Sequence, residues 1–230
     1  MTEAFFQGDL NMTTRTIITA LLLLSTFGCC TSGHQSSLPQ NPLWLGIADD
    51  VSGSVEESRL PVFTGDHLKD IVSILKIRGG AVAFDLIDED AFQPLTRLEL
   101  VRLAGRLDER ARINQRNMST EADFNATVEQ KINRPRNARR TDIKGYLARF
   151  VLFFSEPTIP PGAEKVMLFI SDGIDTGPRR RLSEIRLPED VKIFAIGTEK
   201  TLAEKLFGNQ AFLFESISAA IESLKTRQRS

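Results

Sequence analysis

The stretch LGIADDVSGSV, residues 45–55, decides the fold and indicates where a function would lie. Its first residues are apolar, as in a strand that is buried on both faces. The run ends in Asp49 and Asp50, and Ser52 and Ser54 follow with one residue between them. Ligands of α/β sheets bind beyond the carboxyl ends of the strands. A carboxylate and two hydroxyls at a strand end therefore predict an oxygen-rich binding site.

Apolar runs of strand length alternate with amphipathic helical patterns along the rest of the chain. The predicted strands are residues 43–48, 81–87, 92–101, 166–170, 191–196 and 211–214, and the predicted helices are residues 68–75, 143–154 and 215–224. Near-continuous apolar strands between helices are typical of a mostly parallel sheet with helices on both faces. Pro94 is tolerated only in an edge strand or at the start of a strand, so an edge position is one expectation for residues 92–101. The sequence therefore predicts an α/β fold.

The composition excludes several classes of function. Hydrophobic residues make up 41% and charged residues 26% of the 230 residues, as in an ordinary globular domain. A net charge of −1 with one tryptophan and one tyrosine argues against a nucleic-acid partner. The two cysteines, Cys29 and Cys30, are adjacent, so they give no disulfide framework. Two histidines give little support for a zinc site.

Residues 12–29 have the pattern of a secretory signal peptide. Arg15 precedes an apolar run at 17–24, which is shorter than the roughly 20 residues that span a bilayer. The segment resembles the signal peptide of bacterial lipoproteins. This resemblance implies lipidation of Cys29 after cleavage, with Cys30 as the alternative acceptor. An ordinary cleaved signal and an uncleaved anchor stay open.

We expect the folded domain to follow this signal. Residues 1–11 carry acidic residues ahead of the basic one, so we expect them to be an upstream extension before a true start at Met12. Residues 30–41 have the Ser, Gly and Pro content of a flexible linker. The domain is expected at residues 42–227. The expected localisation is the bacterial cell envelope, after secretion across the inner membrane and anchoring by lipid.

Five oxygen donors are expected to meet at one end of the sheet. They follow predicted strands or precede a predicted helix: Asp50, Ser52, Ser54, Thr141 and Asp172. Two carboxylates and three hydroxyls suit Mg²⁺, or Mn²⁺ or Ca²⁺, rather than zinc or copper. Simpler alternatives stay open. The serines fit turn hydrogen bonds, and Thr141 fits a helix N-cap with Asp142 supporting the positive end of the helix dipole.

These residues resemble the von Willebrand factor type A (vWA) domain with its metal-ion-dependent adhesion site (MIDAS). DVSGS resembles the family's DxSxS motif at Asp50, Ser52 and Ser54. TDI resembles its threonine loop at Thr141, and FISDGIDTG resembles its acidic loop at Asp172. The resemblance spans about residues 42–226. It implies a Rossmann-like, doubly wound sheet with one antiparallel edge strand, and a divalent ion completed by water or by a partner's acidic residue.

Other positions extend this pattern or depart from it. Asp49 stands where the family usually has an aliphatic residue, and it is either a polar strand end or a further metal ligand. Thr120 and Thr127 compete with Thr141 for the threonine position. Asp175 either holds a metal-bound water or only forms the turn.

Residues 97–140 form a basic segment, expected to be helical at about 104–140. Eleven Lys and Arg residues stand against six Asp and Glu residues there, and Phe124 and Val128 mark a packed helical face. The segment is either a solvated helical surface or a positive rim that attracts an acidic partner. Binding to anionic lipid headgroups is a further alternative.

The predicted function is binding rather than catalysis. We expect a lipid-anchored envelope protein whose metal takes an Asp or Glu from a protein partner. One alternative is a Mg²⁺-dependent phosphoryl hydrolase that uses Asp50 as nucleophile or metal ligand. The sequence offers it no GxxxxGK, GxGxxG or GxSxG motif. Another alternative is a scaffold whose oxygens only stabilise turns.

Overall fold

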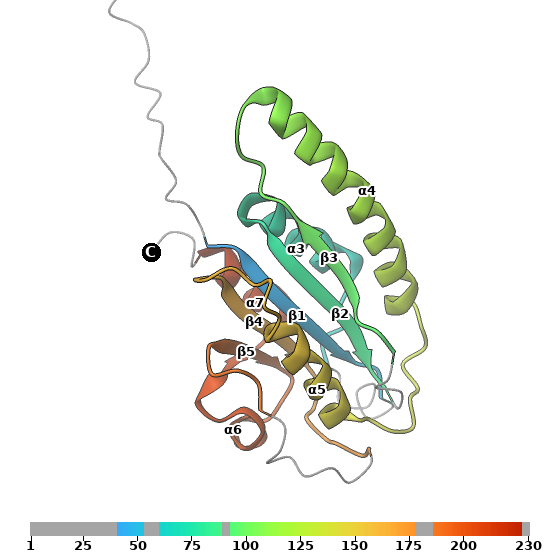
Figure 1. Ribbon diagram of the computed structural model, residues 1–230. Coiled ribbons are helices and arrows are strands. Elements are labelled where there is room, and N and C mark those ends of the chain that lie inside the picture. Colours follow the sequence, from blue (N-terminus) through green and yellow to red (C-terminus); the bar gives the residue numbers. More distant parts are fainter. Residues whose placement is uncertain (1–40, 53–59, 89–92, 178–185, 227–230) are drawn as a thin grey trace, which may run out of the picture. The chain divides into compact units, whose positions relative to one another are not determined.

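A computed structural model describes residues 41–52, 60–88, 93–177 and 186–226. Six strands form one sheet in the order β3-β2-β1-β4-β5-β6 (Figure 1). The strands are β1 (Leu43–Asp50), β2 (Gly80–Ile87), β3 (Thr96–Leu100), β4 (Glu164–Ile170), β5 (Val191–Ile196) and β6 (Ala211–Phe214). The edge strand β3 runs antiparallel to β2, and the other neighbouring pairs are parallel. This topology confirms the predicted α/β, Rossmann-like fold with one antiparallel edge strand.

Helices cover both faces of the sheet, as expected. They are α3 (Gly65–Arg78), α4 (Leu107–Ile132), α5 (Ile143–Phe154), α6 (Lys200–Phe207) and α7 (Ile217–Thr226), with a short 3₁₀ helix, η2 (Gly208–Gln210). One apolar cluster joins Leu45 and Ile47 of β1 to side chains of α3, α4 and α7. A second cluster joins Trp44 and Ala48 of β1 to side chains of α5 and α6. No helix in the described ranges is long and apolar enough to cross a membrane.

The position of β1 explains why its end can hold a buried site. All eight of its residues are buried, and it pairs with β2 on one side and β4 on the other. Because side chains alternate along a strand, Asp50 shares a face with Ala48, the α5 face, whereas Asp49 shares the opposite face with Ile47. The two neighbouring aspartates therefore point into different environments.

Strand β3 and helix α4 are shorter than the sequence predicts. The strand expected at 92–101 extends only over Thr96–Leu100, after Pro94. In the basic segment, α4 ends at Ile132, and residues 133–140 leave the helix to run toward α5. Phe124 and Val128 are buried, as their spacing predicts.

Gly46 allows α5 to pack directly on β1. A β-carbon there would lie 2.8 Å from Cδ1 of Phe150, closer than side-chain carbons pack. We expect Gly46→Ala to lower the free energy of unfolding by about 1–3 kcal/mol, because it overpacks the core. Chemical denaturation measures this change. The matched control is Gly65→Ala, where a β-carbon would meet nothing within 4 Å. Equal unfolding midpoints for the two variants would contradict this account.

Candidate functional site

Asp50 is a fully buried carboxylate at the carboxyl end of β1. Its Oδ2 accepts a hydrogen bond from Oγ of Ser171 at 2.6 Å, and its Oδ1 accepts one from the N–H of Ser52 at 2.9 Å. Ser171 directly follows β4, which is the neighbour of β1 in the sheet. The carboxylate therefore ties together the ends of two parallel strands, and Ser52 lies beside it.

The charge of a second carboxylate acts on Asp50. Burial raises the pKa of Asp50, and the negative charge of Asp172 raises it further, while the hydrogen bonds from Ser171 and Ser52 lower it. Asp50 and Asp172 therefore lie in the same region of the protein, although they are far apart in the sequence. A cation bound between them would remove this repulsion and offset the desolvation of Asp50.

Thr141 is held against the loop that carries Asp172. The N–H of Thr141 donates to Oγ1 of Thr176 at 2.8 Å, and the N–H of Thr176 donates to the carbonyl of Thr141 at 3.1 Å. A β-carbon on Gly177 would lie 2.7 Å from Cα of Asp142, so only glycine permits this approach. The sequence thus brings the threonine segment and the acidic loop together, with Thr141 only 2% exposed.

The alternative in which Thr141 is the N-cap of α5 is wrong, because the next residue occupies that position. Asp142 is the N-cap, and its Oδ1 accepts a hydrogen bond from the N–H of Gly145 at 2.9 Å. The competing residues Thr120 and Thr127 lie within α4, where their hydroxyls donate to carbonyl oxygens of the same helix. Of these threonines, Thr141 is the one that the described hydrogen bonds join to the acidic loop.

The acidic loop orients its two aspartates by turn hydrogen bonds. Oδ1 of Asp172 accepts the N–H of Ile174 at 2.8 Å, and Oδ1 of Asp175 accepts the N–H of Gly177 at 3.2 Å. The other carboxylate oxygen of Asp175 lies 3.5 Å from Nζ of Lys144. Asp175 thus forms the turn, which is one of the two roles that the sequence left open for it. Ser54 lies outside the described residues.

On the opposite face of β1, Asp49 forms a buried ion pair with Arg136. Nη2 of Arg136 donates to Oδ2 of Asp49 at 2.6 Å, and Nη1 donates to the carbonyl oxygen of Asp50 at 3.0 Å. The Oδ1 atom of Asp49 is buried without a hydrogen-bond partner in the described ranges. Burial raises the pKa of Asp49 to about 7, although Arg136 opposes this change. The carboxylate of Asp49 is therefore engaged by an arginine.

The connection from α4 to α5 passes along the end of β1. The N–H of Ala138 donates to the carbonyl of Val51 at 3.1 Å, and Ala138 forms a parallel bridge with Ser52. Figure 1 shows this connection, in yellow-green, passing the carboxyl ends of β1 and β2 at the lower right, where the loop after β4 also lies.

These contacts gather four of the predicted donors at one end of the sheet. They are Asp50, Ser52, Thr141 and Asp172. Two carboxylates and two hydroxyls fit a hard divalent cation such as Mg²⁺ or Mn²⁺. The described residues contain no group of three or more His, Cys, Asp and Glu that could hold a metal, so such a site would depend on hydroxyl oxygens.

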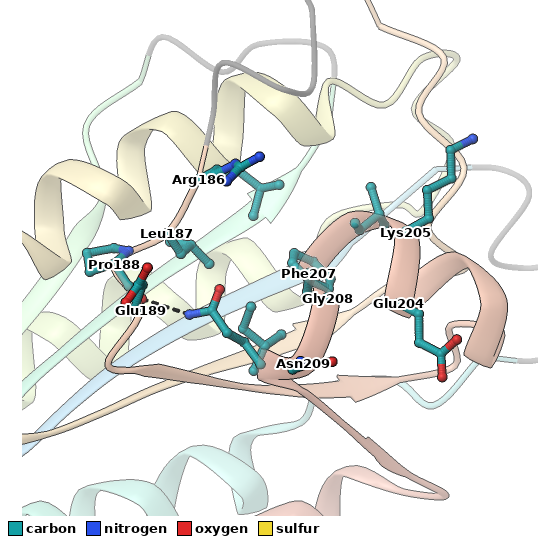
Figure 2. A pocket seen from close by; sticks show the side chains of 13 residues that line it. Arg186, Leu187, Pro188, Glu189, Glu204, Lys205, Phe207, Gly208 and Asn209 are labelled. Carbon is teal, nitrogen blue, oxygen red and sulfur yellow. Dashed lines mark hydrogen bonds between the residues drawn. The ribbon is translucent and has the colours of Figure 1, made fainter.

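A hollow of about 770 Å³ lies beside α6 and is lined in part by Leu187, Glu204 and Phe207 (Figure 2). The Nε2 atom of Gln210 donates to the carbonyl of Val191, the first residue of β5, at 2.9 Å. The hollow thus lies toward the amino end of β5, whereas ligands of α/β sheets bind at the carboxyl ends. We therefore do not place the site there.

Three residues of this end of the sheet were not predicted from the sequence. Ser171 and Thr176 lie in the acidic loop, and their only signal was a hydroxyl beside a predicted ligand. Arg136 contacts residues 86 and 87 positions earlier, and nothing in the sequence marks that pairing.

Taken together, fold and donors define an α/β, Rossmann-like domain with an oxygen-rich cluster at the carboxyl ends of its central strands. No family model matches the sequence, and no curated protein matches it. Solved structures do match, at low identity. The proximal thread matrix protein 1 of the mussel byssus matches at 17% identity and a TM-score of 0.43, over 82% of this chain and 47% of that chain.

Two further matches also have low sequence identity. A von Willebrand factor type A structure from Catenulispora acidiphila has 14% identity and a TM-score of 0.46, over 82% of this chain and 42% of that chain. The manganese-loaded TRAP protein of Plasmodium vivax has 13% identity and a TM-score of 0.46, over 83% of this chain and 73% of that chain. This chain spans about half the length of the mussel protein. The fold assignment rests on the strand order and directions.

The pair of Asp49 and Arg136 gives a prediction about stability. We expect Arg136→Leu to lower the free energy of unfolding by about 3–5 kcal/mol, because it leaves the buried carboxylate of Asp49 without its cation. The double variant with Asp49→Leu should lose less, because both partners are then removed. Denaturant unfolding measures both effects. Arg134→Leu changes an exposed arginine nearby and should stay within about 0.5 kcal/mol of the wild type. Strictly additive single effects would refute the pairing.

Proposed function

We propose that this protein is a lipid-anchored cell-envelope protein that binds a protein partner through a divalent cation. The observation that carries the proposal is the buried carboxylate of Asp50, whose pKa is raised by burial and by the charge of Asp172. Two carboxylates that oppose each other beside buried hydroxyl residues form a set of oxygens that favours a hard cation.

Each residue has a distinct role in this proposal. Asp50 and Asp172 would supply negative charge, and Ser52, Ser54 and Thr141 would supply neutral oxygens. Bound there, the cation supplies a Lewis-acidic position for a carboxylate of the partner. The hydroxyl of Ser171 fixes the orientation of Asp50 and favours its charged form. Burial of Asp50 and Thr141 keeps water away from the protein side of the site.

Metal binding should stabilise the native state. We expect Mg²⁺ or Mn²⁺ to raise the melting temperature of the wild type, because a ligand that binds only the folded protein adds about 2.7 kcal/mol at one hundred times its Kd. Asp50→Asn and Asp172→Asn should abolish this rise. Differential scanning calorimetry with and without EDTA measures it.

The control for this experiment is Asp66→Asn. Asp66 is an exposed aspartate of α3 that pairs only locally with Lys69, so its removal should leave the metal-dependent rise unchanged. A wild type that melts at the same temperature in Mn²⁺ and in EDTA would refute the metal site. Sustained phosphoester hydrolysis in Mg²⁺ that is lost in Asp50→Asn would replace the binding function by the hydrolase alternative.

The lipid anchor has its own test. We expect the precursor expressed in a bacterial host to incorporate labelled palmitate, because residues 12–29 resemble a lipoprotein signal. Cys29→Ser should abolish the incorporation, and Cys30→Ser, its matched control, should retain it. Label that survives Cys29→Ser and disappears in Cys30→Ser would move the lipid to Cys30. Label in neither the wild type nor the variants would remove the anchor from the proposal.

A further inference from the structure

The connection between α4 and α5 contains four arginines in the seven residues 134–140. They differ in where they lie. Arg136 is directed inward and contacts the carboxylate of Asp49 and the carbonyl of Asp50. The remaining three, Arg134, Arg139 and Arg140, are exposed. They form no ion pair with a carboxylate in the described parts of the chain, and residues 133–140 contain no Asp or Glu.

Arg139 and Arg140 lie beside the oxygen cluster, and Arg134 precedes Ala138 by four residues in the same connection. Ala138 is bridged to Ser52, and Thr141 is bonded to the acidic loop, so both ends of the short stretch between them are fixed at the site. Consecutive Cα atoms are 3.8 Å apart, which places the backbone of Arg139 and Arg140 within about 8 Å of Thr141. The guanidinium of Arg136 holds the same connection against β1.

We propose that Arg134, Arg139 and Arg140 form a cationic rim that selects an acidic protein segment carrying several carboxylates. This inference rests on the proposed function, in which one carboxylate of the partner occupies the metal. Its neighbours would then face three arginines that no carboxylate of the described chain neutralises. The rim therefore distinguishes an acidic segment from an isolated Asp or Glu.

An acidic protein segment fits this rim better than a lipid surface. Clusters that bind anionic headgroups usually contain four to eight basic residues, whereas three arginines are exposed here. The adjoining site requires a ligand that brings a carboxylate, which an acidic segment supplies together with further charge. At about 0.1 M salt the Debye length is about 10 Å, so these arginines act on a partner at the site but not across the molecule.

The experiment uses two synthetic peptides and Mn²⁺. One peptide carries a single Asp among Gly and Ser, and the other carries the same Asp flanked by four Glu. Charges at the rim of an interface mainly change the association rate. We expect the triple variant Arg134→Gln, Arg139→Gln, Arg140→Gln to bind the acidic peptide with an association rate constant about 10-fold lower. At saturating Mn²⁺ its dissociation rate should change by less than twofold, and its binding of the single-Asp peptide should stay unchanged.

The matched control removes three exposed arginines at the far end of α4: Arg106→Gln, Arg110→Gln, Arg112→Gln. Arg112 lies 20 residues before the end of this helix, which corresponds to about 30 Å. The control should bind both peptides like the wild type, and raising the salt to about 0.5 M should remove the difference between the two triple variants. Equal losses in both triple variants would overturn the rim, because the effect would then be one of net charge.

Two further arms separate the alternatives. Vesicles containing phosphatidylglycerol test the lipid surface. If the rim variant loses vesicle binding but keeps the wild-type association rate with the acidic peptide, the inference is overturned. The same peptide rates measured in EDTA at low salt test the metal. If Mn²⁺ and EDTA give equal rates, the metal-dependent function fails, while the ratio of wild-type to rim-variant rates still decides the role of the arginines.

Discussion

The buried carboxylate of Asp50 is the constraint around which this end of the sheet is organised. Moving a carboxylate out of water costs several kcal/mol unless other groups compensate. The hydroxyl of Ser171 and the N–H of Ser52 compensate in part, but Asp172 acts in the opposite direction. A protein that needed only a stable turn could place an uncharged residue here. The buried carboxylate of Asp50, with the charge of Asp172 nearby, is therefore the feature that a bound cation would explain.

The connection after α4 is fixed to the sheet by an arginine and by a single backbone bridge between Ala138 and Ser52. A buried backbone carbonyl needs a hydrogen-bond partner, and the carbonyl of Asp50 receives one from Arg136. The same guanidinium pairs with Asp49, for which the described parts of the chain provide no second ion pair. This side chain and the backbone hydrogen bond from Ala138 to Val51 hold the connection against β1, and Thr141, three residues after Ala138, bonds to the acidic loop.

The sequence predicts the parts of this structure that depend on local pattern. The apolar runs give the strands and their burial, and the polar residues after two of them locate the candidate site at one end of the sheet. It does not predict Arg136, because an ion pair between residues 87 positions apart leaves no periodic trace. The N-cap is misplaced by one residue for a related reason. Thr141 and Asp142 both favour a cap, and the contact of Thr141 with Thr176 decides between them.

Charge also couples the proposed metal site to the proposed arginine rim. Without metal, the two carboxylates of the site stand against three exposed arginines nearby, and a divalent cation would add two more positive charges to the same region. In the proposed function the arginines would weaken metal binding, and an acidic segment at the rim would relieve that repulsion. By linkage, whatever the partner adds to metal affinity, the metal must add to partner affinity by the same factor. If both proposals hold, the rim would disfavour the metal alone and favour the metal together with an acidic segment, so each ligand would bind well only when the other is present.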